Sequence, residues 1–287
     1  YGDHRDLHLS LRRQRQMCIR DSSSTYISAI LIGISLSLMG VVVVARGNVF
    51  VAAAVAQASM LGVALSLFFQ IGQPVLSAVF CSIGASLLVA RKHQVGGGST
   101  SEEMTGWIFL TSGSLSVLLL VRMPYGLKEI QSLFSSSIIG AGSADMFVFS
   151  GLLILFVGFL ALRMRRLTLY LSDPVMAAAV GANIFLWSAA IASSLGLATG
   201  LAIRSSGMLF TFGCLILPAQ MAKIISRDIP RMFMVAPVIA LASVLFGLML
   251  GNSYDLPPAQ TVVALMSGLL LLAWLLKWVY DLVFSST

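Results

Sequence analysis

Side chains able to do acid–base, nucleophilic or metal chemistry are scarce in this sequence of 287 residues. The imidazoles are His4, His8 and His93, and neither a His-Glu-x-x-His motif nor a plausible Ser/His/Asp set accompanies them. The sequence also lacks Gly-x-x-x-x-Gly-Lys-Ser/Thr, the loop with which P-loop proteins bind ATP. We therefore expect this chain to be neither an enzyme nor an ATPase, and to hold no cofactor.

One short segment outside the predicted spans does carry structural information. Asp173 is a good N-cap residue, Pro174 suits the first position of a helix, and Gly181 can end one. The spacing predicts one or two helical turns between them, shaped to transmit force. The alternative is an ordinary loop helix that lies on a membrane surface.

The composition defines the elements that must position this segment. Hydrophobic residues make up 58% of the chain and charged residues 10%, against roughly a quarter in soluble domains. Nine runs free of Asp, Glu, Lys and Arg each approach the 17 to 25 residues that a helix needs to cross ~30 Å of hydrocarbon. The sequence therefore predicts an all-α integral membrane protein, a polytopic bundle with about nine transmembrane helices at 26–45, 48–69, 74–90, 104–121, 146–162, 183–198, 205–222, 232–250 and 257–276.

The basic residues predict how this bundle is oriented. The formal charge is +7, but the basic residues fall in small groups between apolar runs, so we expect them to orient helices and not to bind nucleic acid. With the first span running inward, the outer loops hold Arg122, Lys128 and Arg204. The C-terminus is then cytoplasmic, and the inner loops hold ten basic residues, Arg46, Arg91, Lys92, Arg163, Arg165, Arg166, Lys223, Arg227, Arg231 and Lys277.

Residues 1–22 do not fit this scheme. The first 25 residues carry five arginines but would lie outside, and the run 17–22 resembles a translated sequencing adapter. We expect 1–22 to be a non-native or disordered tail and 26–284 to be the transmembrane domain. The alternative is a genuine cytoplasmic tail with a different number of spans.

Two connections between spans have distinct compositions. Residues 96–101, Gly-Gly-Gly-Ser-Thr-Ser, predict a flexible polar linker. Residues 126–142 have intermediate polarity, which predicts a short interfacial or re-entrant helix followed by a Gly/Ser turn.

The predicted spans lack the ionisable groups typical of ion-coupled transporters. Such transporters place a carboxylate, histidine or arginine within the membrane, whereas here only Asp145 lies at a boundary. The polar groups inside are hydroxyls and the neutral amides of Gln57, Asn183 and Gln220. The sequence thus predicts a bundle without its own energy source.

Three motifs in the second half, in this order, resemble one transporter family. They are Asp-Pro-Val-Met-Ala-Ala-Ala-Val-Gly at 173–181, Ser-Gly-Met-Leu at 206–209 continuing to Leu-Pro-Ala-Gln-Met-Ala-Lys at 217–223, and Tyr-Asp-Leu-Pro-Pro-Ala at 254–259. Their order and spacing resemble the zinc/manganese/iron-uptake ABC permease family, and residues 26–280 match its layout. The family's bacterial members are multi-pass proteins of the cytoplasmic (inner) membrane.

The resemblance implies partners and a coupling site. It implies a homodimeric or paired permease, cytoplasmic ATPase subunits that bind the ATP, and an extracytoplasmic solute-binding protein. In the family, the Asp-Pro-x-x-Ala-x-x-x-Gly segment forms a coupling helix that docks on the ATPase. Carried over, this role falls on Asp173, Pro174, Ala177 and Gly181.

The second span departs from the family pattern. Family members place Asp and His four residues apart on one helix face, where both can ligate a passing cation. The matching positions here are Ala53 and Gln57, followed by Met60, so zinc or manganese as the substrate is in doubt. Met39 and Met60 could add sulfur donors, although no pattern puts either beside Gln57. The alternative is that Gln57 only hydrogen-bonds to a neighbouring helix.

These observations favour one function over two others. We expect this chain to be the membrane-spanning permease subunit of an ABC importer. The substrate, a metal ion or metal-containing solute, is expected to pass Ala53, Gln57 and Met60. A secondary transporter or exporter without ATPase partners is the main alternative, and a membrane-embedded structural subunit is the third.

Overall fold

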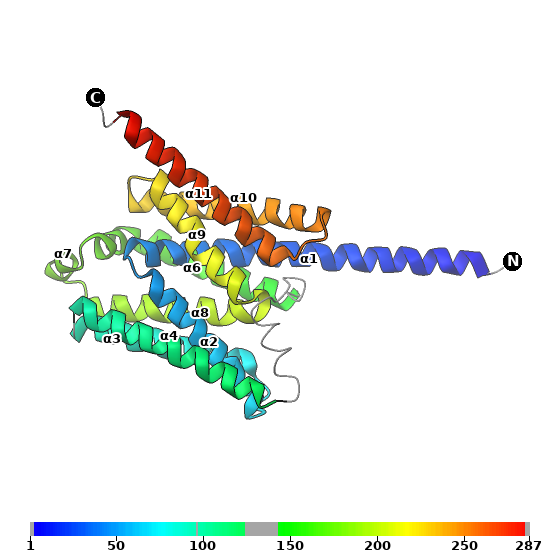
Figure 1. Cartoon of the computed structure of the whole chain (residues 1–287), viewed down its shortest axis with the longest axis horizontal. Helices are drawn as coiled ribbons and strands as arrows, with labels where there is room; N and C mark the ends of the chain where they lie inside the picture. The colour runs from blue at the N-terminus through cyan, green and yellow to red at the C-terminus, as the bar shows by residue number, and fades with distance from the viewer. Residues whose placement is uncertain (1–2, 96, 124–142, 285–287) are drawn as a thin grey trace.

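The computed structural model describes the backbone of residues 3–95, 97–123 and 143–284, and side chains in most of this part. Among these residues every regular element is an α-helix, which confirms the predicted all-α class. The helices, labelled as in Figure 1, are α1 (Asp3–Ala45), α2 (Val49–Phe68), α3 (Pro74–Val95), α4 (Gly97–Val121), α6 (Ser143–Ser172), α7 (Pro174–Ala179), α8 (Ile184–Ser206), α9 (Met208–Ile225), α10 (Ile229–Ser253) and α11 (Pro258–Phe284).

The predicted number of spans is confirmed. Nine of the described helices, all except the six-residue α7, are long and apolar enough to cross a membrane. Among their C-terminal ends the largest difference is at α6, which continues through Arg163 and Arg166 to Ser172, ten residues past the apolar run. Charge ends a hydrophobic run without interrupting backbone hydrogen bonds, so a helix can extend beyond the membrane.

Two segments predicted to be irregular belong to helices. Residues 3–22 form the first part of α1, which extends away from the bundle in Figure 1. This stretch contains no Gly or Pro, so nothing in it breaks a helix that continues into the first span. Residues 97–101, predicted as a linker, start α4. Whether 1–22 is native stays a prediction, and the helix predicted within 126–142 lies outside the described residues.

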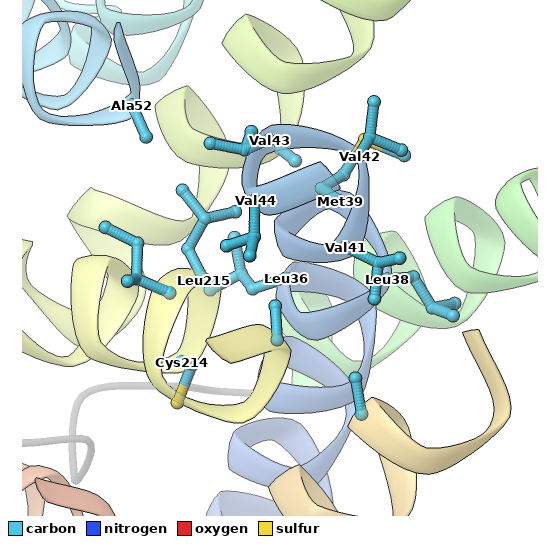
Figure 2. Close-up of a cluster of buried hydrophobic side chains, with 14 of the residues drawn as sticks. Leu36, Leu38, Met39, Val41, Val42, Val43, Val44, Ala52, Cys214 and Leu215 are labelled. Atoms are coloured by element: carbon cyan, nitrogen blue, oxygen red, sulfur yellow. The ribbon is translucent and has the colours of Figure 1, made fainter. Parts of the chain in front are cut away.

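The most buried span is the apolar part of α1. Its window is 78% buried, and α1 packs against α6, α8, α9 and α10. Figure 2 shows Leu36 and Val44 of α1 on the side of the helix that faces Leu215 of α9. At Gly40 the two backbones come so close that a β-carbon would overlap the carbonyl group of Leu215. A small residue there lets the helices approach closely, as is common within membranes.

Successive spans run in opposite directions (Figure 1). The helices α1, α3, α6, α9 and α11 therefore all end at the side of the bundle where α7 lies. The predicted inner groups of basic residues follow or end these five helices. They consequently gather at one end of the bundle, called the inner end below. That this end faces the cytoplasm stays a prediction.

Candidate functional site

The short helix α7 has the predicted local structure. Asp173 is extended, with φ −146° and ψ 99°, and its Oδ1 accepts hydrogen bonds from the backbone N–H groups of Val175 (2.9 Å) and Met176 (3.1 Å). Pro174 occupies the start of the helix, where its missing N–H costs nothing. Gly181 has φ +83°, a left-handed conformation that ends the helix at low cost.

The faces of α7 differ in what they contact. Ala177 is fully buried in the core cluster, and α7 packs against α6 and α8. Val175 is 79% exposed, Met176 55% and Val180 73%. Ala177 therefore attaches α7 to the bundle, whereas the three exposed apolar side chains form the surface that a partner could cover. Ala177, one of the residues predicted to couple to an ATPase, is thus buried within the bundle, and its coupling role stays a prediction.

Helix α8 begins with a second cap next to this segment. Asn183 precedes α8, and its Oδ1 accepts a hydrogen bond from the N–H of Leu186 at 3.2 Å. The connection from α6 to α8 thus contains two side-chain caps, Asp173 and Asn183. Such caps fix where each helix begins, which makes the connection a defined structural unit and not a slack loop.

The predicted path residues on α2 are all buried. Ala53 and Gln57 are each 8% exposed, and Met60 is fully buried. The Nε2 of Gln57 donates a hydrogen bond to the thioether sulfur of Met208, the first residue of α9, at 3.6 Å. A β-carbon added to Gly113 of α4 would lie 3.3 Å from Gln57 Oε1. The amide group therefore sits where α2, α4 and α9 meet.

The sulfur donors divide between two places. Met60 and Met208 belong to one apolar cluster near Gln57. Of the two, Met208 is the one whose sulfur accepts the hydrogen bond from Gln57. Met39 lies in the larger core and accepts a hydrogen bond from Ser194 of α8 at 3.5 Å. Sequence reasoning missed Met208, although the residue stands inside one of the quoted motifs, because its partner lies on a distant helix.

The described residues hold no group of three or more His, Cys, Asp or Glu side chains suited to a metal ion. The surroundings of Gln57 are instead neutral, and the buried hydroxyls of Ser59 and Ser66 on the same helix have no hydrogen-bond partner. At Gln57 itself the groups that meet are an amide and a thioether. These are weak ligands for a divalent cation, compared with carboxylates and imidazoles.

Comparison with known proteins identifies the family. The family model described as the ABC 3 transport family matches residues 22–277. The chain belongs to this family. The resemblance to metal-uptake ABC permeases is thereby confirmed, and ABC 3 membership favours a permease over a secondary transporter. The matched region begins where the predicted tail ends.

Relatives of this ABC 3 protein include two manganese permeases. One is the manganese transport system membrane protein MntC of Halalkalibacterium halodurans, 23% identical over 86% of this chain and 84% of the relative. Another is the manganese import system permease protein ScaB of Streptococcus gordonii, 23% identical over 83% of this chain and 84% of the relative. PsaBC from Streptococcus pneumoniae shares the fold, with a TM-score of 0.75 at 20% identity over 88% of this chain and 90% of that one.

Proposed function

We propose that this chain is the membrane-spanning permease subunit of an ABC importer that carries a metal ion into the cell. The observation that carries the proposal is α7, a doubly hydrogen-bonded, capped helix with an exposed apolar face at one end of a nine-span ABC 3 bundle. A water-exposed apolar helix face is stabilised when a partner protein covers it. The cytoplasmic ATPase is the partner that fits this position.

The remaining parts of the importer follow from the same arrangement. ATP binds to the partner ATPase subunits, since this sequence has no P-loop. An extracytoplasmic solute-binding protein delivers the substrate to the end of the bundle opposite α7. The permease works as a homodimer in the bacterial inner membrane, with its C-terminus in the cytoplasm.

Manganese is the first substrate to test, because the two named relatives are manganese permeases. The neutral surroundings of Gln57 support weak, transient contact with the cation and not tight storage. Fast release suits a pathway, since a cation that binds tightly leaves slowly. A metal-containing solute, in which other ligands shield the cation, fits the same neutral surroundings.

The test is manganese uptake by cells that lack their own manganese importers and express the chain with its ATPase and binding protein. We expect uptake to require an ATPase with an intact P-loop. Met176→Glu should abolish both uptake and co-purification of the ATPase, because it places a charge on the exposed face of α7. Ile225→Glu is the matched control: Ile225 is 61% exposed at the inner end of α9, outside α7. Uptake without any ATPase would overturn the proposal.

A further inference from the structure

The inner end of the bundle contains a stack of one cation and three aromatic rings, here called the inner stack. The guanidinium carbon of Arg46 lies 4.7 Å from the centroid of the Tyr170 ring. The Tyr170 and Trp187 rings stack, with their centroids 6.0 Å apart and an angle of 24° between the ring planes. The centroid of the Phe159 ring lies 5.8 Å from that of Trp187. Arg46 Nη1 also donates a hydrogen bond to the Tyr170 hydroxyl oxygen. One side chain from the end of α1 is thus joined to α6 and α8.

The burial of Tyr170 makes its contact with Arg46 hard to replace. Tyr170 is fully buried, so its hydroxyl oxygen depends on Arg46 for the hydrogen bond that water would otherwise provide. The Arg46 backbone is held as well. Gly47 has φ +71°, and the N–H groups of Gly47 and Asn48 bond to the carbonyls of Val44 (3.2 Å) and Val43 (3.0 Å), which closes the end of α1.

The inner stack flanks α7 on both sides. Tyr170 lies in the last turn of α6, three residues before the cap Asp173, and Trp187 lies in the first turn of α8, four residues after the cap Asn183. A displacement of α7 therefore acts on both rings. Through Arg46, the same displacement acts on α1, the most buried span, which itself contacts α9 and α10.

Arg46 also has room for a second position. A cavity of about 60 Å³ lies beside it, between α1, α2, α3 and α8, with the polar side chains Asn48, Ser86 and Ser188 in its lining. The rest of the lining is apolar, but these three side chains and the Arg46 guanidinium supply the polar partners that a water in the cavity needs. The guanidinium can thus either pair with Tyr170 or be hydrated in the cavity. Two such discrete arrangements are what a coupling element needs.

We propose that Arg46 and Tyr170 are positioning residues that transmit the displacement of α7 to α1, through the switch of Arg46 between the Tyr170 ring and a hydrated position beside Asn48, Ser86 and Ser188 in the cavity. In this role neither residue needs to contact ATP or the transported cation. The inference rests on the proposed function, since it takes α7 as the helix on which the ATPase acts.

The experiment uses the purified complex of permease, ATPase and binding protein in proteoliposomes, with Mn²⁺ as the transported ion. The readouts are complex assembly, ATP hydrolysis stimulated by the loaded binding protein, and Mn²⁺ moved per ATP. We expect Arg46→Met to assemble normally but to lose about tenfold in stimulation, within the range of ordinary coupling between sites. Arg46→Lys, which keeps the charge over the ring, should retain part of it. Arg165→Met, an exposed arginine on α6, is the control and should match the parent.

A double-mutant cycle separates transmission from general stability. Tyr170→Phe keeps the ring stacked on Trp187 and removes only the hydroxyl group. If Arg46 acts through Tyr170, the double variant should lose no more stimulation than Arg46→Met alone. Independent, multiplicative losses would overturn the inference, as would full stimulation in Arg46→Met. Failure of the parent permease to bind any ATPase would instead overturn the proposed function, so the two failures are distinguishable.

Discussion

The Nε2 of Gln57 lies 3.6 Å from the sulfur of Met208, and this hydrogen bond joins the middle of α2 to the start of α9. The bond turns the amide nitrogen toward α9, while the amide oxygen faces Gly113 of α4. Gln57 is the position at which the family resemblance predicts an imidazole, and its neutral amide is already engaged by Met208. Ala53, one turn earlier, supplies no ligand atom.

A carboxylate and an imidazole at these two positions should create a metal site. The variant Ala53→Asp with Gln57→His places both groups on one helix face, four residues apart. Because anionic and imidazole donors offset the dehydration of a cation, we expect it to bind Mn²⁺ or Zn²⁺ at least about tenfold tighter than the parent. Calorimetry on the purified permease measures this, with Gln57→His alone as the control. Tight binding in the parent that survives Gln57→Ala would contradict the prediction.

The two neighbouring alanines of α7 should respond differently to arginine. Ala177 is fully buried, so Ala177→Arg should detach α7 and lower the thermal stability of the permease itself. Ala178 is exposed, so Ala178→Arg should leave stability unchanged and block co-purification of the ATPase. Thermal unfolding and pull-down of the ATPase distinguish these effects. Normal assembly of the Ala178→Arg permease with the ATPase would show that α7 is not the helix on which the ATPase docks.

Removal of the α7 cap should loosen the helix without unfolding the bundle. Asp173→Ala eliminates both side-chain hydrogen bonds to the N–H groups of Val175 and Met176, a loss of about 1 kcal/mol in helix stability. Hydrogen exchange at residues 174–179 should become faster. Asp173→Asn keeps an acceptor oxygen, so its exchange should stay close to that of the parent. Equal exchange in all three proteins would show that the cap is not needed.

A methyl group at Gly40 should destabilise the contact between α1 and α9. Its β-carbon would overlap the Leu215 carbonyl, so the helices must separate, at a cost of about 1–3 kcal/mol for overpacking. Gly158→Ala is the matched control, because nothing lies within 4 Å of a β-carbon there. Thermal unfolding in detergent should show a lower midpoint for Gly40→Ala only. Equal midpoints would mean that the close approach of the two helices is not maintained.

The C-terminus should be cytoplasmic. Ten basic residues against three support this orientation, and the structure brings the backbone at those ten positions to the inner end of the bundle. A reporter fused after Asp281 should be active only as a cytoplasmic fusion. A fusion truncated after Asn252, at the opposite end of the last two spans, should report the outside. The reverse pattern of reporter activity would show that the inner end of the bundle faces the outside of the cell.

The sequence alone determined the features that depend on local or bulk properties. The all-α class and the nine spans among the described residues follow from apolar runs, since backbone groups within hydrocarbon must bond inside their own helix. The cap at Asp173 follows likewise from residues within three positions of one another. The extension of α6 past Arg163 was missed, because the end of an apolar run does not mark the end of a helix.

Only the tertiary structure decided which side chains meet across helices. Gln57 and Met208 are 151 residues apart, and Arg46 and Tyr170 are 124 residues apart. Each contact depends on how two helices are rotated and shifted against each other, which close packing at small residues such as Gly40 fixes. For the same reason the sequence could not show that Ala177, within the predicted coupling segment, is buried where α7 packs against α6 and α8. Hydropathy locates each span, but the direction in which a side chain points is a property of the assembled bundle.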